Sequence, residues 1–188
     1  GMASSAIPKF RLDNQSIELD IENIVSLGVQ IIYNQVIDKN EFLKIKKEYN
    51  FIYISVGAQD ARKFPIDGSE NYGVLNPLTF LFGAKNGNVD SFGKKIVVIG
   101  GGNTAIDAAR TAKRLIPKDG SVSLVYRRTI KQMPANEEEI KALIDEEIEI
   151  LELVNPLKIN QKDGKIKSIT CQKMKLGEKW LREFTNRS

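Results

Sequence analysis

The sequence predicts an α/β fold, a Rossmann-like domain with a parallel sheet and a C-terminal β-hairpin, and three observations lead to this prediction. Through residues 94–154, short Val- and Ile-rich runs alternate with amphipathic segments of helical length. A glycine-rich turn, "GGGN", joins one of these runs to the helical segment after it. The residues from 157 onward alternate apolar and polar around "QKDG". Strands that alternate with helices imply parallel βαβ units, and the final pattern is typical of an antiparallel hairpin.

The composition is that of an ordinary globular protein, with 41% apolar and 28% charged residues over 188 positions. No apolar run is long enough for a membrane span, and no signal peptide is recognisable, so we expect a cytoplasmic protein with no membrane partner. The chain has no histidine and a single cysteine, Cys171, which argues against a metal site, a disulfide framework and a CxxC redox pair. We interpret Cys171 as a small buried apolar residue.

The net charge is +4, and the lysines of the C-terminal segment could indicate nucleic-acid binding. In "GKIKSITCQKMKL", however, these lysines alternate with apolar residues, as on the solvent-facing side of a hairpin. We therefore favour the hairpin and expect no nucleic-acid partner. Residues 137–152 are strongly acidic by contrast, and could pair with nearby arginines.

The first half of the chain mixes helical and strand patterns. A helix over 17–27 is expected to be capped by Ser16 and ended by Gly28, and a second helix covers 40–49. The β-branched and aromatic runs predict strands, the second of them buried; they span 29–34 and 51–57. The next twenty or so residues, rich in Pro and Gly, predict a linker.

The second half predicts the elements of the βαβ domain in sequence order. Helices are expected where apolar residues recur at helical spacing, over 77–85, 103–116 and 135–146. Strands are expected over 94–100, 121–126 and 148–154, followed by hairpin strands over 157–160 and 165–176.

The turn after the first of these strands matches the dinucleotide-binding pattern G-x-G-x-x-G/A through Gly100, Gly102 and Ala105. Gly100 would allow a tight turn, Gly102 a close approach to a pyrophosphate, and Ala105 close packing of helix on strand. The N–H groups from Gly101 to Thr104, including that of Asn103, would point at the ligand from a helix N-terminus. The alternative is a glycine turn that links strand and helix and binds nothing.

The next strand, "SVSLVY", predicts which dinucleotide is bound. In an NAD site a carboxylate at the end of this strand hydrogen-bonds the ribose 2′-hydroxyl. Here the strand ends at Arg127 and Arg128, with Lys131 soon after. Guanidinium groups bind phosphate in a bidentate manner, so these residues favour the 2′-phosphate of NADPH. The alternative is that both arginines are surface residues paired with Glu137–Glu139.

Several stretches in a fixed order carry a family resemblance: "IPKFRL", "ISVGAQD", "IVVIGGGNTAIDAARTA", "LVYRRTIKQMPA" and "CQKMKLGE". From about Ile7 to Glu178 the chain resembles the small (beta) subunit family of NADPH-dependent glutamate synthase. The same module is similar to parts of dihydropyrimidine dehydrogenase, ferredoxin:NADP transhydrogenase and selenate reductase-type proteins.

The resemblance implies two cofactors, NADPH and FAD, with electrons passing from NADPH to FAD and on to iron–sulfur clusters. Gly100 to Asp107 would hold the pyrophosphate, Arg127 and Arg128 the 2′-phosphate, and Gly57 would lie beside FAD. The domains implied are part of an FAD-binding domain over 1–76 and an NADPH-binding domain over 77–188. The expected partners are the missing halves of the FAD domain and an iron–sulfur domain or large subunit.

Several family features are missing from the sequence. The FAD glycine fingerprint, the N-terminal cysteine motifs and the closing "AIG" and "GD" motifs are absent, and "FRLDNQ" replaces "FRLPK". We therefore expect a module that delivers hydride from NADPH to FAD but is inactive alone, with no side chain as acid or base. A non-catalytic NADP(H) sensor is the alternative. A thioredoxin-reductase-like enzyme is disfavoured because the CxxC pair is missing.

Overall fold

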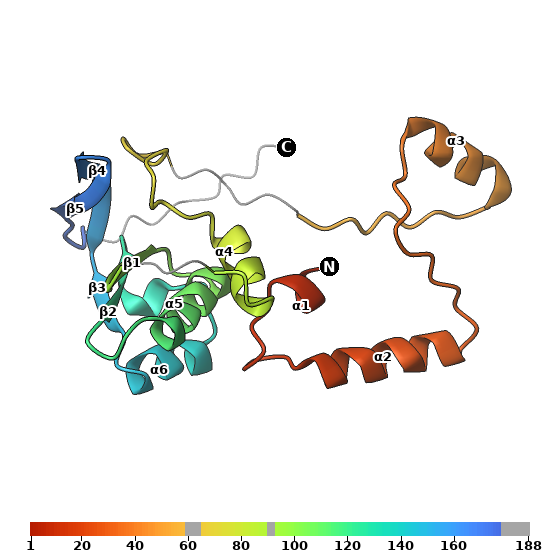
Figure 1. Cartoon of the computed structure of the whole chain (residues 1–188), viewed down its shortest axis with the longest axis horizontal. Helices are drawn as coiled ribbons and strands as arrows, with labels where there is room; N and C mark the ends of the chain where they lie inside the picture. The colour runs from red at the N-terminus through yellow and green to blue at the C-terminus, as the bar shows by residue number, and fades with distance from the viewer. Residues whose placement is uncertain (59–64, 90–92, 178–188) are drawn as a thin grey trace, which may run out of the picture.

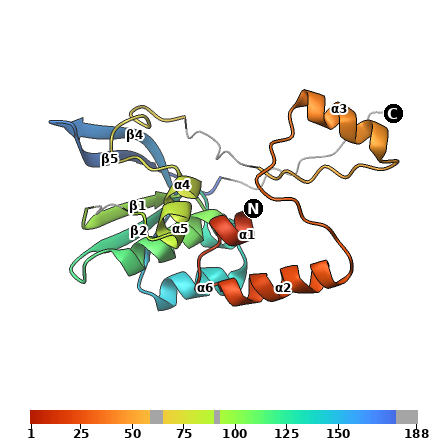
Figure 2. The ribbon, with the colours of Figure 1, turned by 45° about the vertical axis from the view of Figure 1, so that its right-hand side comes forward.

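A computed structural model describes residues 1–58, 65–89 and 93–177 of the chain. Its body consists of a three-stranded parallel sheet, the helices packed on it and a separate two-stranded hairpin (Figure 1). The helix α2 (Asn14–Ser26) extends away from this body, and α3 (Lys39–Glu48) stands apart from it in both ribbon views (Figures 1 and 2). The α/β prediction is thus confirmed for the second half of the chain.

The parallel sheet has the strand order β1-β2-β3, with β1 (Lys95–Ile99), β2 (Ser121–Tyr126) and β3 (Glu149–Glu152). Ile96 is opposite Val122, and Leu124 is opposite Ile150. The helix α5 (Asn103–Leu115) connects β1 to β2, and α6 (Glu137–Asp145) lies between β2 and β3. All five elements agree with the predicted ones to within a few residues at each end.

One face of the sheet forms the core with α5 and α6. Ile106, Leu124 and Leu143 are completely buried there, and Ala109 and Ala112 bring α5 close to the sheet. Burying a leucine or isoleucine side chain contributes about 1.5–3 kcal/mol. These small residues therefore lie on the packing face of α5. The helix α4 (Pro77–Lys85), capped by Asn76, packs against α5.

The hairpin pairs β4 (Val154–Lys162) with β5 (Lys165–Lys173) in antiparallel register. Asp163 and Gly164 form its turn with φ of 53° and 70°, the left-handed conformation of a two-residue hairpin turn. Val154 belongs to β4 and not, as predicted, to the preceding strand, because Leu153 has a φ of 54° and ends the extended run. Cys171 is exposed, which corrects the prediction of a buried thiol: this hairpin is solvated along most of β5.

The predicted strands over 29–34 and 51–57 are wrong for this structure, because neither segment is assigned to a strand. Their side chains are largely exposed, with Phe51 at 93% and Tyr53 at 92%. An apolar run forms a strand only where a neighbouring strand pairs with its N–H and C=O groups. The sheet described here consists of β1, β2 and β3 and does not extend to these segments.

The helix α2 is capped differently from the prediction. Asp13, not Ser16, is the N-cap of α2: its carboxylate accepts the Ser16 N–H at 2.8 Å and the Ser16 hydroxyl at 2.9 Å. These bonds lower the pKa of the Asp13 carboxyl. Gly28 follows the helix with a φ of 88°, as expected of a glycine that ends a helix. The short helix α1 (Met2–Ser5) had no sequence signal.

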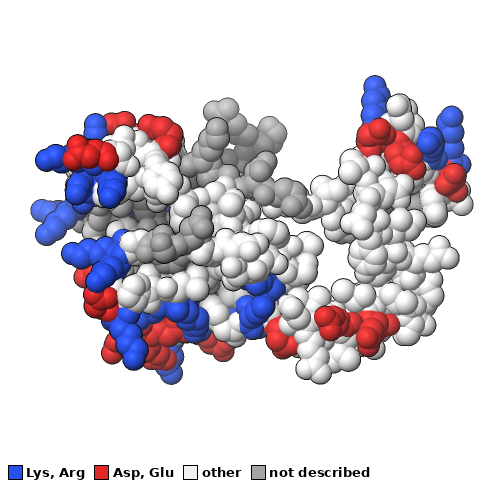
Figure 3. All heavy atoms as spheres, in the orientation of Figure 1, with Lys and Arg blue, Asp and Glu red and all other residues white. Residues whose placement is uncertain are grey.

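Charged side chains are distributed unevenly over the surface. Lysines and arginines gather over the body, at the end that carries the hairpin, whereas α2 shows mainly acidic side chains (Figure 3). No helix in the described ranges is both long and apolar enough to cross a membrane.

Candidate functional site

The glycine turn joins the carboxyl end of β1 to the N-terminus of α5. Gly100 has a φ of 139°, a conformation that residues with a side chain rarely adopt, and a Cβ there would lie 3.1 Å from the Cβ of Ala105. Strand end and helix thus approach closely at the two positions where the motif requires small residues. Gly102 is the N-cap of α5 in an extended conformation, and a Cβ added to it would meet only Pro134, at 4.0 Å.

The N-terminus of α5 offers a row of hydrogen-bond donors. Among the described residues, no hydrogen bond is formed by the backbone N–H of Gly101, Gly102, Asn103 or Thr104, whereas the Gly100 N–H binds the Val125 carbonyl at 3.1 Å. Asn103 and Thr104 are exposed. The helix dipole adds partial positive charge at this end. These donors suit an anionic group such as a pyrophosphate.

Arg127, Arg128 and Lys131 lie in a segment that we name the arginine loop, residues 127–132, which follows the carboxyl end of β2. All three side chains are exposed. None of the ion pairs among the described residues includes them. Glu139 is instead paired with Arg11 and Arg110, at 3.2 and 2.9 Å, so the acidic helix does not neutralise the arginine loop.

The structure brings the glycine turn and the arginine loop together through Tyr126, a residue that the sequence reasoning missed. A Cβ on Gly101 would lie 2.6 Å from the Tyr126 ring, so the bare Gly101 backbone packs against this ring. The Tyr126 hydroxyl donates to the Gln132 carbonyl at 2.9 Å. The Asn103 amide oxygen also accepts the Asn136 N–H, at 3.4 Å. A tyrosine at the end of β2 was visible in the sequence, but its contacts depend on the fold.

The predicted flavin contact, Gly57, is not part of this arrangement. It has a φ of 69° and follows the exposed segment 51–56, outside the sheet that carries the glycine turn. Part of "ISVGAQD" lies beyond the described residues, which stop at 58 and resume at 65.

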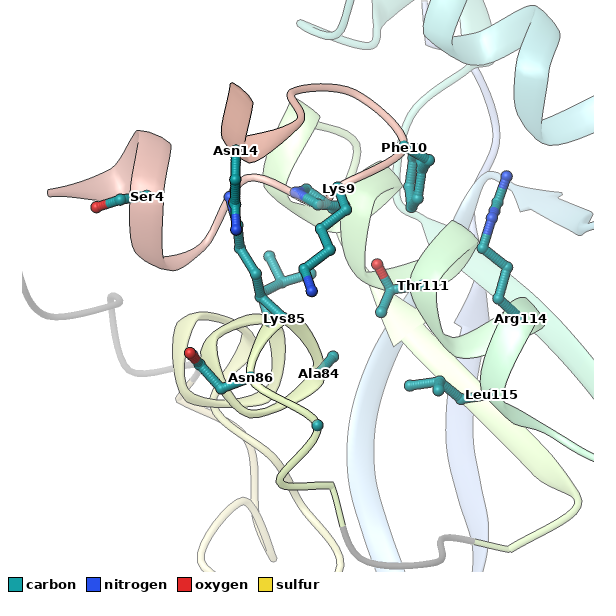
Figure 4. A pocket seen from close by; sticks show the side chains of 13 residues that line it. Ser4, Lys9, Phe10, Asn14, Ala84, Lys85, Asn86, Thr111, Arg114 and Leu115 are labelled. Carbon is teal, nitrogen blue, oxygen red and sulfur yellow. The ribbon is translucent and has the colours of Figure 1, made fainter. Parts of the chain in front are cut away.

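A cavity of about 690 Å³ lies between the N-terminal segment, α4 and the second half of α5 (Figure 4). Lys9, Lys85, Thr111 and Arg114 are among its lining residues. Thr111 follows Asn103 by about 12 Å along the helix, at about 1.5 Å per residue. The cavity is therefore separate from the glycine turn.

The segment "IPKFRL" is fastened to the outer side of α5 and α6. Arg11 binds Asp107 at 2.8 Å, and the Phe10 ring lies under the guanidinium groups of Arg110 and Arg114, at 4.7 and 4.0 Å. Asp107, at the end of the motif, therefore faces this segment. Its carboxyl pKa is raised because burial outweighs the attraction of Arg11. Lys85 adds hydrogen bonds to the carbonyls of Ala3 and Ile7, at 2.7 and 2.8 Å, and burial lowers its pKa.

Glu146 anchors α6 to α5 by accepting hydrogen bonds from Arg110 at 2.9 Å and from Arg114 at 2.7 Å. Although burial opposes it, these two guanidinium groups hold the pKa of the Glu146 carboxyl below its ordinary value of 4.5. A lowered pKa means that the stabilisation is complete above pH 4.5 and is lost as the pH falls through the lowered value.

We expect Glu146→Gln to lower the free energy of unfolding by about 1–3 kcal/mol at pH 7, because a charge-assisted contact to two arginines is lost. Below pH 4.5 the difference from the unaltered chain should shrink. Urea unfolding of both proteins at pH 7 and in mild acid measures this difference in unfolding free energy. The raised pKa of Asp107 favours the folded state in acid, but Asp107 is present in both proteins, so its contribution cancels in the difference. Glu138→Gln, on the exposed side of the same helix, is the control. If the difference in unfolding free energy between Glu146→Gln and the unaltered chain stayed constant with pH, the ionised Glu146 carboxylate would not be what stabilises the fold.

Comparison with known proteins places this geometry in a family. Residues 3–179 match the family described as pyridine nucleotide-disulphide oxidoreductase. The chain is 33% identical, over 183 residues, to the NADPH-Fe(3+) oxidoreductase subunit beta of Geobacter sulfurreducens, covering 95% of this chain and 27% of that protein. It is 34% identical to the NADP(+)-dependent formate dehydrogenase subunit beta of Moorella thermoacetica, covering 95% and 26%.

The glutamate synthase [NADPH] small chain of Escherichia coli is 27% identical, with 95% of this chain and 40% of that one covered. The chain thus spans about a quarter to two fifths of the length of these relatives. Among solved structures, 2-naphthoyl-CoA reductase shares the fold, with a TM-score of 0.55 and 20% identity over 77% of this chain and 20% of that one. The predicted relationship to the glutamate synthase small chain is confirmed, and the chain belongs to the pyridine nucleotide-disulphide oxidoreductase family.

Proposed function

We propose that the chain is the NADPH-binding portion of an FAD-dependent pyridine-nucleotide oxidoreductase. In this proposal residues 77–188 form the NADPH-binding domain and residues 1–76 are part of the FAD-binding domain. The main observation in support is that the open N-terminus of α5, at Gly102, follows β1 while the arginine loop follows the neighbouring parallel strand β2, so that both lie at the carboxyl end of the sheet. The names of two relatives, which specify NADPH and NADP(+), support the choice of nucleotide.

Each part of the site has a role in this proposal. The N–H groups of Gly101, Gly102, Asn103 and Thr104 would hold the pyrophosphate, with Gly100 and Ala105 keeping strand and helix close. Arg127 and Arg128 would bind the 2′-phosphate in bidentate fashion, and Lys131 would add a point charge. A phosphate of nearly two negative charges would balance cations that form no ion pair within the described residues.

When bound, NADPH would supply a hydride and FAD would accept it, and the cofactors themselves carry this chemistry. The residues of this chain therefore have to bind and orient the nucleotide, and they need not move a proton. The absence of histidine from the sequence agrees with such a role. Gly57 would contact FAD only once the rest of the FAD-binding domain surrounds the 51–57 segment.

The proposed partners are the missing halves of the FAD-binding domain and, beyond them, an iron–sulfur domain or a large subunit in a cytoplasmic complex. The relatives named subunit beta and small chain are components of larger assemblies. The many exposed apolar side chains between 19 and 56 would be covered by the remainder of the flavin domain.

The proposal is tested by calorimetric titration of the chain with NADPH and, separately, with NADH. We expect NADPH to bind at least about tenfold more tightly, because NADH leaves the arginine loop without a phosphate partner. We also expect the purified chain to carry no tightly bound flavin. Equal affinity for the two nucleotides, no binding of either, or a yellow preparation with a flavin spectrum would contradict these expectations.

A further inference from the structure

The arginine loop is held in place by several hydrogen bonds, although its cationic side chains are free of ion pairs among the described residues. Inside the loop, Thr129 and Gln132 cap each other: the Gln132 N–H donates to the Thr129 carbonyl at 2.9 Å, and the Thr129 hydroxyl to the Gln132 side-chain oxygen at 3.2 Å. The Leu153 N–H binds the Arg128 carbonyl at 3.1 Å. These hydrogen bonds restrain the backbone of the loop against local opening, and with it the Cα positions from which the side chains of Arg127 and Arg128 extend.

A carboxylate from the neighbouring strand makes one of the central contacts. Glu152, at the carboxyl end of β3, accepts the backbone N–H of Ile130 through Oε2. The parallel register places Glu152 opposite Tyr126, which fastens the other end of the loop through its bond to the Gln132 carbonyl. The ends of β2 and β3 therefore hold the loop from two sides.

We infer that Glu152 is a positioning residue for the 2′-phosphate, one that fixes the arginine loop through Ile130 so that Arg127 and Arg128 lie where the phosphate binds. The inference rests on the proposed NADPH-binding function. The negative charge of Glu152 by itself would oppose phosphate binding, whereas its hydrogen bond to the Ile130 N–H would favour it by holding the loop in place. Because the two effects on NADP⁺ affinity have opposite signs, variants that remove one or both of them can separate the effects.

The test compares Glu152→Ala with Glu152→Gln, using NADP⁺ and NAD⁺ as probes. Both variants remove the charge, but glutamine keeps an oxygen that can accept the Ile130 N–H. We expect Glu152→Gln to bind NADP⁺ as tightly as the unaltered chain or more tightly, and Glu152→Ala to bind it about 3- to 10-fold more weakly than Glu152→Gln. Binding of NAD⁺, which has no 2′-phosphate, should be the same in all three proteins.

Glu149→Ala is the matched control, since Glu149 lies three residues earlier on the same strand and accepts a hydrogen bond from the Ser123 hydroxyl, at 2.8 Å, instead of from the loop. It should leave the ratio of NADP⁺ to NAD⁺ affinities unchanged. Glu152→Asp, which keeps the charge but draws the acceptor back, should weaken NADP⁺ binding even if Glu152→Ala does not fold.

Equal NADP⁺ affinity in the alanine and glutamine variants, or parallel loss of NAD⁺ binding, would overturn the inference and leave the proposed function standing. A failure of the unaltered chain to prefer NADP⁺ would overturn both. The thermal unfolding midpoint of each variant shows whether a loss of affinity is a loss of folded protein.

Discussion

Replacement of Arg127 by alanine is expected to weaken NADPH binding by about 10- to 100-fold, since a charge-assisted contact to phosphate contributes about 1.5–3 kcal/mol. Binding of NADH should be unchanged. Arg127 is exposed and has no ion-pair partner in the described part of the chain, so the loss should not be masked by rearrangement of an existing pair. Titration of the variant with both nucleotides measures the effect.

Lys118→Ala is the matched control for this prediction. It removes one exposed positive charge beyond the C-terminal end of α5, whereas the glycine turn lies at the other end of the same helix. The control should change NADPH affinity by less than about twofold, because a distant surface charge is largely screened by salt. Equal losses in the two variants would mean that overall charge, and not the arginine loop, attracts the nucleotide.

The elements of the nucleotide domain could be predicted closely because their signals are local. The runs over 121–126 and 77–85 coincide with β2 and α4, bounded by glycine, proline and asparagine residues that end or cap them. Each of the three parallel strands finds its neighbour within residues 95–152, so periodicity and pairing agree.

The prediction of strands over 29–34 and 51–57 was wrong because these segments have no neighbouring strand in the described structure. Their residues have strand propensity, but a strand also requires a neighbour, and none of β1 to β5 pairs with these segments. Propensity is a weak guide where tertiary pairing is missing.

The site was predictable where a motif fixes the backbone and unpredictable where it depends on register. The glycine turn follows from Gly100, Gly102 and Ala105 alone. The contact of Tyr126 with Gly101 and the bond from Ile130 to Glu152 arise only when β1, β2 and β3 are aligned. The link between Arg11 and Asp107 joins residues that are 96 positions apart, and no sequence pattern indicates it.

The largest loss of binding is expected from Gly102→Ala, which changes the helix N-terminus where the pyrophosphate would lie. The φ of Gly102 is −94°, and a Cβ would meet no protein atom closer than 4.0 Å, so the fold should accept alanine. A methyl group would nevertheless occupy the space that the motif leaves for the close approach of the pyrophosphate. Displacing a bound anion from several N–H donors should cost at least about 100-fold in NADPH affinity, at about 1.5–3 kcal/mol for each charge-assisted bond.

Gly93→Ala is the matched control, because Gly93 precedes the amino end of β1, whereas the glycine turn follows its carboxyl end, and a Cβ on Gly93 would also meet no atom within 4 Å. The most direct test of the account is therefore NADPH titration of the unaltered chain, Gly102→Ala and Gly93→Ala, with the unfolding temperature of each. We expect all three proteins to be folded at the temperature of the titration, with a small decrease of the unfolding temperature in Gly102→Ala because alanine is a poorer N-cap than glycine, and NADPH binding to be lost in Gly102→Ala alone. Undiminished NADPH binding by folded Gly102→Ala would contradict it.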